Sequence, residues 1–218
     1  MPAIAKHTAA LAAALLFAAA PAAVEAKQPK YSSSYGQDRA QIEDLMARYL
    51  FAIDYSDWDA YVATFAEDGE LTFANGTSKG RAAIRDAVTK FAVGIGKFYH
   101  TADGKPAKLR HIILQSVIRV EGDRAWARSQ WLEMANHGEG DQPKIGTYGV
   151  YEDELVKQKG QWLFAKRNVL NEFIKSRTTG PENPVAQMDA AVDGPVKEAA
   201  QEKVKEKKRN FEVRRRRP

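Results

Sequence analysis

The stretch RYLFAIDYSDWDAYVATFAEDGELTF, residues 48–73, decides the fold of this chain. It continues an amphipathic helix whose apolar residues recur at intervals of three and four: Ile42, Leu45, Met46, Tyr49, Leu50 and Ile53. Asp54 closes that helix, and Ser56-Asp57-Trp58-Asp59 then supplies a capping residue with an acid three positions on. The stretch therefore predicts two consecutive helices, followed by a strand over Glu70–Phe73.

The flanking residues extend this pattern in both directions. Residues 27–36 form a polar leader, and periodic structure begins at Gln37. The segment Phe65–Gly69 is predicted as a turn, and Asn75-Gly76 is a second turn signal. Gly80 opens a third helix, whose apolar face is carried by Ile84, Val88 and Phe91.

Beyond a polar loop around residues 94–107, the apolar pattern changes to a period of two. Turns at 121–123 and 158–160 and a loop at 136–144 separate four expected strands, over residues 109–120, 124–135, 145–157 and 161–174. Three helices followed by a long antiparallel meander predict an α+β fold, in which a curved sheet covers the helices.

Composition describes a globular protein of one domain. The chain has 218 residues, 44% of them apolar and 28% charged. It contains no cysteine, which excludes disulfide scaffolds, thiolate metal sites and cysteine nucleophiles. The net charge is +5, but residues 196–218 hold ten Lys or Arg against four Glu, so the rest carries −1. The basicity belongs to a tail, and no nucleic-acid partner is expected for the domain.

The two ends of the chain carry their own signals. Residues 1–26 contain Lys6 and then an uncharged Ala/Leu-rich run, and they predict a secretory signal peptide cleaved after Ala26. The alternative is an uncleaved anchor, and no later segment has the roughly 20 apolar residues that a membrane span needs. The mature chain is therefore expected in a bacterial periplasm. Residues 178–218 are predicted as a linker and a solvated basic tail.

The stretch quoted above, together with GRAAIRDAV, LRHIILQSVIRVEGDRAWARSQWLEM and GQWLFAKRNVLNEF, resembles the SnoaL-like branch of the nuclear transport factor 2 superfamily. The resemblance covers roughly residues 37–175, and the domain is expected over residues 37–177. It is strongest to the group that holds scytalone dehydratase and bile-acid 7α-dehydratase. It implies a cone-shaped α+β barrel whose deep pocket needs no metal or organic cofactor. Its most specific element is Tyr49-x4-Asp54-x2-Asp57-Trp58-Asp59 with a later histidine, His111.

Asp54 and His111 are the first candidate pair. His111 shares one strand face with Leu109, Ile113 and Val117. Such a histidine is either a hydrogen-bonded core residue or a base. Asp54 follows the apolar stripe directly, where it caps the second helix, is solvated in the turn or serves a site. A carboxylate that accepts from one ring nitrogen leaves the other nitrogen free as a general base. The resemblance implies this pairing, because both residues match the dyad of the dehydratases.

Arg167 and two tyrosines are further candidates. Arg167 lies on a strand face with Leu163, Ala165, Val169 and Phe173, so it needs an anion or a substrate carbonyl. By resemblance it matches a pocket arginine, and Lys166 on the opposite face is the alternative. Tyr49 matches a pocket tyrosine, although it could equally be a core aromatic. Tyr151 falls where scytalone dehydratase has a pocket asparagine, which implies that it lines the cavity.

The sequence departs from scytalone dehydratase at two pocket positions. The second pocket histidine of that enzyme is replaced here by Arg128 or Ser129, and the tyrosine beside its aspartate is Ile53. These residues are expected to line the pocket, but the scytalone reaction itself is not expected.

A metal site is not expected either. His100, His111 and His137 show no helical or hairpin spacing to one another. Asp57 and Asp59 are assigned to the first turn of a helix, where negative charge suits the helix dipole.

The expected function is a cofactor-independent lyase or isomerase that acts on a small, mostly apolar, hydroxylated carbonyl compound. In this mechanism His111, oriented by Asp54, removes a proton next to the carbonyl, while Tyr49 and Arg167 stabilise the enolate. The alternative is a non-catalytic module that binds a small ligand or a partner on the same fold. The resemblance also implies a homo-oligomer, either a dimer or a trimer.

Overall fold

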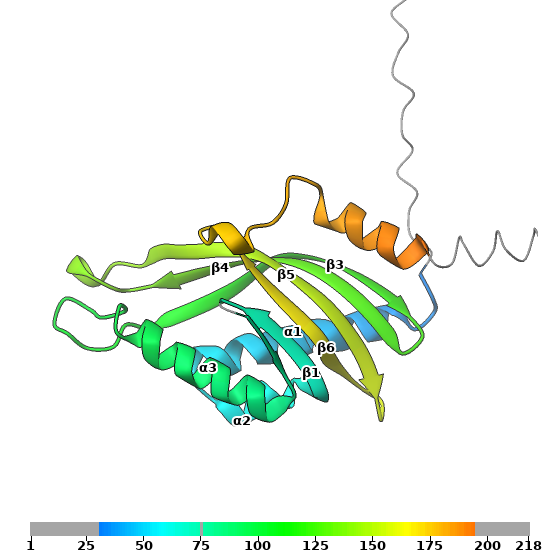
Figure 1. The fold of residues 1–218 in the computed structure, drawn as a ribbon, viewed down its shortest axis with the longest axis horizontal. Helices are drawn as coiled ribbons and strands as arrows, with labels where there is room; N and C mark the ends of the chain where they lie inside the picture. The colour runs from blue at the N-terminus through cyan, green and yellow to red at the C-terminus, as the bar shows by residue number, and fades with distance from the viewer. Residues whose placement is uncertain (1–30, 75, 195–218) are drawn as a thin grey trace, which may run out of the picture. The chain divides into compact units, whose positions relative to one another are not determined.

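The computed structural model describes residues 31–74 and 76–194. The main helices are α1 (Tyr35–Asp54), α2 (Trp58–Ala63) and α3 (Arg81–Gly96), and β1 and β2 lie between α2 and α3 in the chain. The strands are β1 (Phe65–Phe73), β2 (Gly76–Lys79), β3 (Leu109–Glu121), β4 (Arg124–Ala135), β5 (Lys144–Gln158) and β6 (Gln161–Asn171). They form one six-stranded sheet in the order β2-β1-β6-β5-β4-β3, with α1, α2 and α3 against one face (Figure 1).

The predicted α+β fold is confirmed, and the structure corrects two details of the sheet. The sheet is mixed and not antiparallel throughout, because β1 runs parallel to β6, with Leu71 opposite Arg167. It is also open and not closed into a barrel, since β2 and β3 are its two ends. The parallel pairing gives hydrogen-bond partners to the second edge of β1, which would otherwise stay unpaired.

The expected turn over Phe65–Gly69 is wrong, because these residues begin β1. The register between β1 and β6 shifts between Phe65 and Glu70, which marks a bulge. A Cβ at Gly69 would lie 2.9 Å from the carbonyl oxygen of Phe164. The glycine therefore marks the close approach of two strands and not a reversal of the chain.

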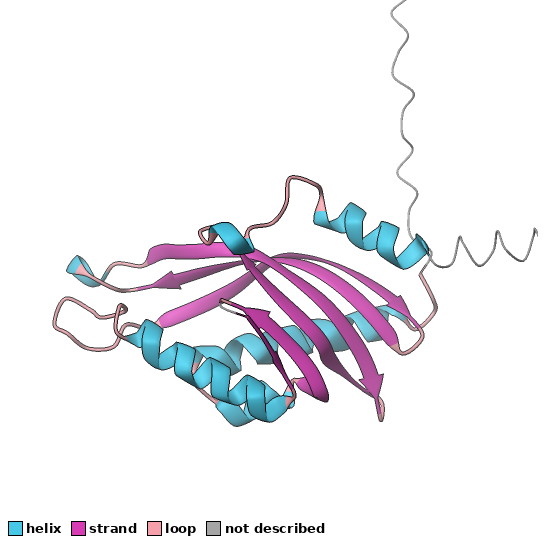
Figure 2. Cartoon of the chain, in the orientation of Figure 1, coloured by secondary structure: helices cyan, strands magenta, loops and turns pink. Residues whose placement is uncertain are grey.

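The expected last strand is too long, and the expected linker is partly helical. β6 ends at Asn171, whose side chain accepts a hydrogen bond from the backbone N–H of Phe173. A helix over residues 184–194 lies on the face of the sheet opposite α1 (Figure 2). It buries Met188 and Val192, which are four residues apart and so share one helix face. The predicted signal peptide and the charged end of the tail lie outside the described residues.

Arg119 of β3 attaches this helix to the sheet. Its guanidinium lies 3.1 Å from a carboxylate oxygen of Asp189 and 2.8 Å from one of Asp193. The side chain of Arg119 is largely buried between them, and these carboxylates help to raise its pKa against the opposing effect of burial. No helix in the described residues is both long and apolar enough to span a membrane.

The core lies between the three helices and the sheet. Its fully buried side chains include Ile42 and Met46 of α1 and Phe65 and Phe164 of the sheet. At the start of α1, the buried carboxylate of Asp38 accepts hydrogen bonds from Lys157 and Trp162 of the β5–β6 hairpin, at 2.7 and 3.1 Å. Burial opposes ionisation of Asp38, but these donors outweigh it and lower the pKa of that carboxyl.

Candidate active site

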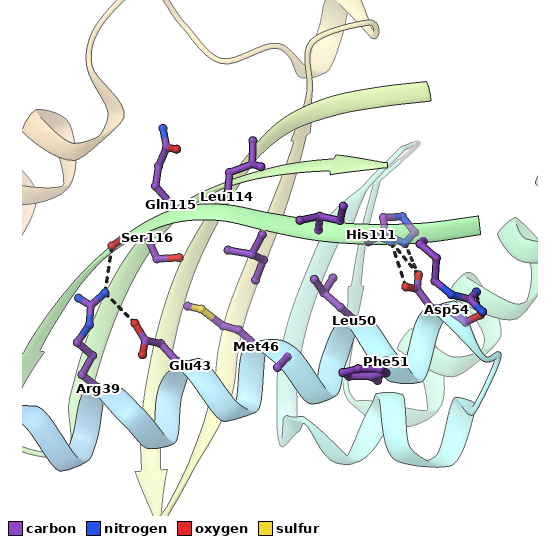
Figure 3. A pocket seen from close by; sticks show the side chains of 14 residues that line it. Arg39, Glu43, Met46, Leu50, Phe51, Asp54, His111, Leu114, Gln115 and Ser116 are labelled. Carbon is purple, nitrogen blue, oxygen red and sulfur yellow. Dashed lines mark hydrogen bonds and ion pairs between the residues drawn. The ribbon is translucent and has the colours of Figure 1, made fainter. Parts of the chain in front are cut away.

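A groove of about 720 Å³ runs between α1 and β3, which is the edge strand of the sheet (Figure 3). At one end, Arg39 reaches the carboxylate of Glu43, at 2.7 Å, and the carbonyl oxygen of Ser116, at 3.5 Å. At the other end lie Asp54 and His111. The wall that α1 contributes is mostly apolar between these ends: Met46, Ala47, Leu50 and Phe51.

The predicted contact between Asp54 and His111 is present. One carboxylate oxygen of Asp54, the last residue of α1, lies 2.6 Å from Nδ1 of His111. The same carboxylate accepts from the backbone N–H of His111, at 3.0 and 3.2 Å. Both side chains are largely buried, with 6% and 10% of their surfaces exposed. In the neutral ring, this contact favours the tautomer whose proton lies on Nδ1, which leaves the lone pair on Nε2.

The structure also decides how α2 is capped. Asp57 is the capping residue, since its side chain accepts from the backbone N–H of Ala60 at 3.0 Å. The alternative in which Asp54 caps this helix is therefore excluded. Asp59 lies in the first turn of α2, as expected.

Glu133 faces the other ring nitrogen of His111 and was missed by the sequence analysis. The two residues are opposite each other in the β3–β4 pairing, and Oε2 of Glu133 lies 3.9 Å from Nε2 of His111. The buried carboxylate accepts hydrogen bonds from the hydroxyls of Tyr99 and Thr147. Burial and the carboxylate of Glu133 raise the pKa of Tyr99 well above its usual range, so that hydroxyl stays protonated.

Arg167 lies in the core with a partner that the sequence analysis did not identify. Its Nε and Nη2 each lie 2.8 Å from an oxygen of Asp153, and both side chains are fully buried. The guanidinium also lies over the rings of Tyr49, Tyr151 and Phe164, at 4.1, 4.3 and 3.9 Å. The anion that Arg167 requires is therefore Asp153, while Nη1 has no hydrogen-bond partner among the described residues.

The neighbours of Arg167 complete a buried aromatic cluster. Tyr61 donates a hydrogen bond to the hydroxyl of Tyr49 at 2.8 Å. Burial raises the pKa of Tyr49, and the positive charge of Arg167 opposes this shift. Lys166 lies on the opposite face, where it pairs with Glu154 at 3.4 Å, so Arg167 is the inward residue of the two.

Trp131 connects the aromatic cluster to the dyad. Its ring centroid lies 5.6 Å from that of Tyr151, in a stacked arrangement, and 6.2 Å from that of His111. In the described part of the chain, no hydrogen bond, ion pair or ring contact joins His111 to Tyr49 or Arg167. The four predicted catalytic residues thus form two neighbouring groups, one of which borders the groove.

The predicted pocket residues separate by strand face. Ser129 points inward, is buried and shares a hydrogen bond of 2.8 Å with Ser116 at the groove. Arg128 is the next residue along β4 and so points outward, where it lies 3.5 Å from Glu152. Its placement in the pocket is therefore wrong. Ile53 packs against the core and is not part of the groove wall, and Tyr151 belongs to the aromatic cluster.

In residues 31–74 and 76–194, no three His, Asp or Glu side chains are arranged to hold a metal ion. The acidic neighbours of His111 are Asp54 and Glu133 alone within these ranges, and His137 instead packs against the ring of Tyr99 at 4.9 Å. The chemistry that the described site offers is proton transfer between a nitrogen base and oxygen groups.

Comparison with solved structures finds the same fold in proteins of low identity. The Mycobacterium tuberculosis protein Rv3472, described as of unknown function, is 26% identical with a TM-score of 0.53, over 67% of this chain and 79% of that one. A Novosphingobium aromaticivorans protein named "Putative Scytalone Dehydratase" is 28% identical with a TM-score of 0.50, over 62% and 84%. ActVI-ORFA of Streptomyces coelicolor is 22% identical with a TM-score of 0.55, over 64% and 98%.

Sequence comparison gives the family. No curated protein matches the chain. A family model described as "SnoaL-like domain" matches residues 35–168, which extend from the start of α1 into β6 and include the whole candidate site. The resemblance drawn from the motifs around Asp54 and His111 is thereby confirmed: the chain belongs to the SnoaL-like domain family.

Proposed function

We propose that this protein is a cofactor-independent lyase or isomerase, of the dehydratase type, that uses His111 as its general base. The observation that carries the proposal is the 2.6 Å contact between Asp54 and Nδ1 of His111, next to a groove. A carboxylate in this position fixes the tautomer of the imidazole and stabilises its protonated form. A buried carboxylate and imidazole so arranged match the requirements of proton abstraction better than those of a purely structural contact.

The proposed reaction begins when Nε2 of His111 removes a proton from a carbon next to a carbonyl group. The electron pair of the broken C–H bond moves onto the carbonyl oxygen and forms an enolate. Tyr49 and Arg167 do not border the groove, and they are proposed to stabilise this charge from the buried cluster beside it, because a buried hydroxyl and a buried guanidinium lower the cost of a nearby oxyanion. Nη1 of Arg167 is the N–H group that retains donor capacity.

Elimination then completes the reaction. The enolate electrons return to form a carbon–carbon double bond, and the bond to a hydroxyl group on the next carbon breaks. The departing oxygen takes the proton from Nε2 of His111 and leaves as water, so the base is regenerated without a cofactor.

The groove supports a mostly apolar substrate. Met46, Leu50 and Phe51 line the approach to the dyad from α1, and Ile113 lines it from β3. The family shown by the sequence also includes dehydratases and isomerases, and one similar structure is named as a dehydratase. We therefore propose a small hydroxylated carbonyl compound, such as a polyketide or steroid, as the substrate.

The test is a screen of the purified protein, without residues 1–26, against hydroxylated steroids and polyketides. Loss of water is read by mass spectrometry, with His111→Asn as the control. We expect dehydration by the wild-type chain and none by the variant. Tight binding of compounds without turnover by the wild-type chain would support the non-catalytic alternative instead.

A further inference from the structure

Glu133 is a buried carboxylate whose position is fixed from three sides. Its side chain comes from β4 and is 12% exposed. The hydroxyl of Tyr99 donates to Oε1, and the hydroxyl of Thr147 donates to Oε2 at 3.4 Å. A carboxylate buried without compensating charge is costly, so its retention beside His111 requires a reason.

Gly146 of β5 provides the space that this carboxylate occupies. A Cβ at position 146 would lie 2.4 Å from Oε1 of Glu133, a distance that carbon and oxygen cannot tolerate. Even alanine at this position would displace Glu133. Two segments thus hold this carboxylate in place: β5, with Gly146 and Thr147, and the loop after α3, with Tyr99.

The distance between Glu133 and His111 indicates a shared contact. Oε2 lies 3.9 Å from Nε2, which is too long for a direct hydrogen bond. One oxygen atom placed about 2.8–3.2 Å from each of the two atoms fits this separation. Such an oxygen can accept a proton from Nε2 and donate its own hydrogen to Oε2.

We propose that Glu133 is a further catalytic residue, which holds the leaving hydroxyl group of the substrate against Nε2 of His111. This inference rests on the dehydratase function proposed above. The substrate hydroxyl donates its hydrogen to Oε2, which directs an oxygen lone pair at the protonated Nε2. When the carbon–oxygen bond breaks, its electron pair stays on that oxygen, which takes the proton from Nε2. Water leaves, and Glu133 neither gains nor loses a proton in this step.

This arrangement selects the class of leaving group. Once Nε2 is protonated, a free hydroxyl accepts from Nε2 and donates to Oε2, whereas a methyl ether has no hydrogen for the carboxylate and leaves it unpaired. A site built to bind a hydroxyl rejects an analogue that lacks the donor, often by a factor of about 10⁴. The enzyme should therefore act on alcohols and not on their O-methyl ethers.

The first test needs no substrate. A crystal structure of the wild-type chain at high resolution should show one ordered water within about 3.2 Å of both Nε2 and Oε2, as a stand-in for the leaving hydroxyl. A direct contact between the two side chains, or a site without that water, would overturn the inference. The structure of Glu133→Gln should retain the hydrogen bond from the hydroxyl of Tyr99, which would show that the variant folds correctly around position 133.

The second test is kinetic and uses a substrate found by the screen. Glu133→Gln and the shorter Glu133→Asp should each lower kcat about 10-fold to 100-fold with little change in KM. Glu154→Gln, on the exposed face of β5, should leave both constants unchanged. If Glu133→Gln is fully active and His111→Asn is inactive, the proposed role of Glu133 is overturned and the proposed function still stands. Full activity of His111→Asn would overturn the proposed function, and the water position would still decide the Glu133 contact.

Discussion

Asp54 contacts His111 through both the ring and the backbone, so the two residues form one unit and not two independent groups. We expect His111→Asn to abolish turnover, because no other imidazole borders the groove among the residues that the structure describes. Asp54→Asn should weaken turnover by disturbing the tautomer and the basicity of the ring. The double variant should be about as slow as His111→Asn, since residues that act together are not additive. The measurement is kcat/KM for the four proteins. If the loss of kcat/KM in the double variant equals the product of the two single losses, Asp54 and His111 act independently and the prediction is wrong.

Arg167 and Asp153 give a second prediction at this scale, on stability. Both side chains are fully buried, so the loss of one partner leaves an unpaired charge in the core. Arg167→Met and Asp153→Leu should each lower the free energy of unfolding by about 3–5 kcal/mol. The double variant should lose less than the sum of the two. Urea unfolding measures all three variants, and fully additive losses would argue against the pair.

Residue periodicity placed His111 and Arg167 on inward faces, but it was wrong about some of their neighbours, because register shifts interrupt the alternation of side chains. Val117 is exposed and Ile118 is buried beyond the shift in β3. In β6, Phe164 lies beside Arg167, in place of the expected Leu163 and Ala165.

Periodicity did not identify the partners of His111 and Arg167. Asp153 and Glu133 were overlooked although both alternate with inward aromatic residues, Tyr151 and Trp131, which is the signal that could have found them. Contacts across strands depend on register, and the sequence of one strand does not contain the register of its neighbour.

At the level of elements, Asp38 connects α1 to the β5–β6 hairpin and makes that connection depend on pH. Its folded pKa lies below the ordinary value of 3.8, so its stabilising effect is complete above 3.8 and disappears as the pH falls through the folded pKa. Asp38→Asn should cost about 1 kcal/mol at pH 7, and the difference from wild type should shrink below pH 3.8.

Chemical unfolding at several pH values measures this effect of Asp38. The matched control is Asp44→Asn on the same helix, an exposed carboxylate that pairs only with Arg48 among the contacts described. It should change stability little at any pH. A constant difference between Asp38→Asn and wild type down to acidic pH would contradict the assignment.

The helix over residues 184–194 should stabilise the domain, and two truncations, one that removes the helix and one that keeps it, test this. A chain that ends at residue 183 loses the buried side chains of Met188 and Val192 and two carboxylate partners of Arg119. Its melting temperature should fall by roughly 5–10 °C. A chain that ends at residue 195 should melt like the full chain, because the deleted residues 196–218 are strongly polar. Equal melting temperatures for both truncations would show that the helix contributes nothing.

Most elements were predictable from sequence, and their connections were not. The limits of α1, α3 and β3–β5 were predicted to within a few residues, because long amphipathic segments carry strong periodic signals. β2 and the helix over 184–194 were missed, since short segments bury few side chains. The parallel pairing of β1 with β6 was also missed, because hydropathy patterns do not specify which strands become neighbours.

For the whole molecule, export is the first property to test. We propose that the mature chain begins at Lys27 after signal cleavage and resides in the periplasm, as the composition of residues 1–26 suggests. N-terminal sequencing of protein recovered from a periplasmic extract measures this directly. An intact Met1 on protein from the cytoplasm would contradict the proposal.

The parallel pairing of β1 with β6 has a consequence for the timing of folding. Phe65 of β1 pairs with Phe164 of β6. β1 therefore cannot form its parallel pairing until a segment nearly one hundred residues later in the chain has been synthesised. Closing so long a loop is costly in entropy and slows folding. The sheet cannot be completed until β6 has been synthesised. For most of its synthesis the chain therefore lacks its complete tertiary fold and can still pass through a narrow channel. That delay is the property that a secretion channel requires of its cargo.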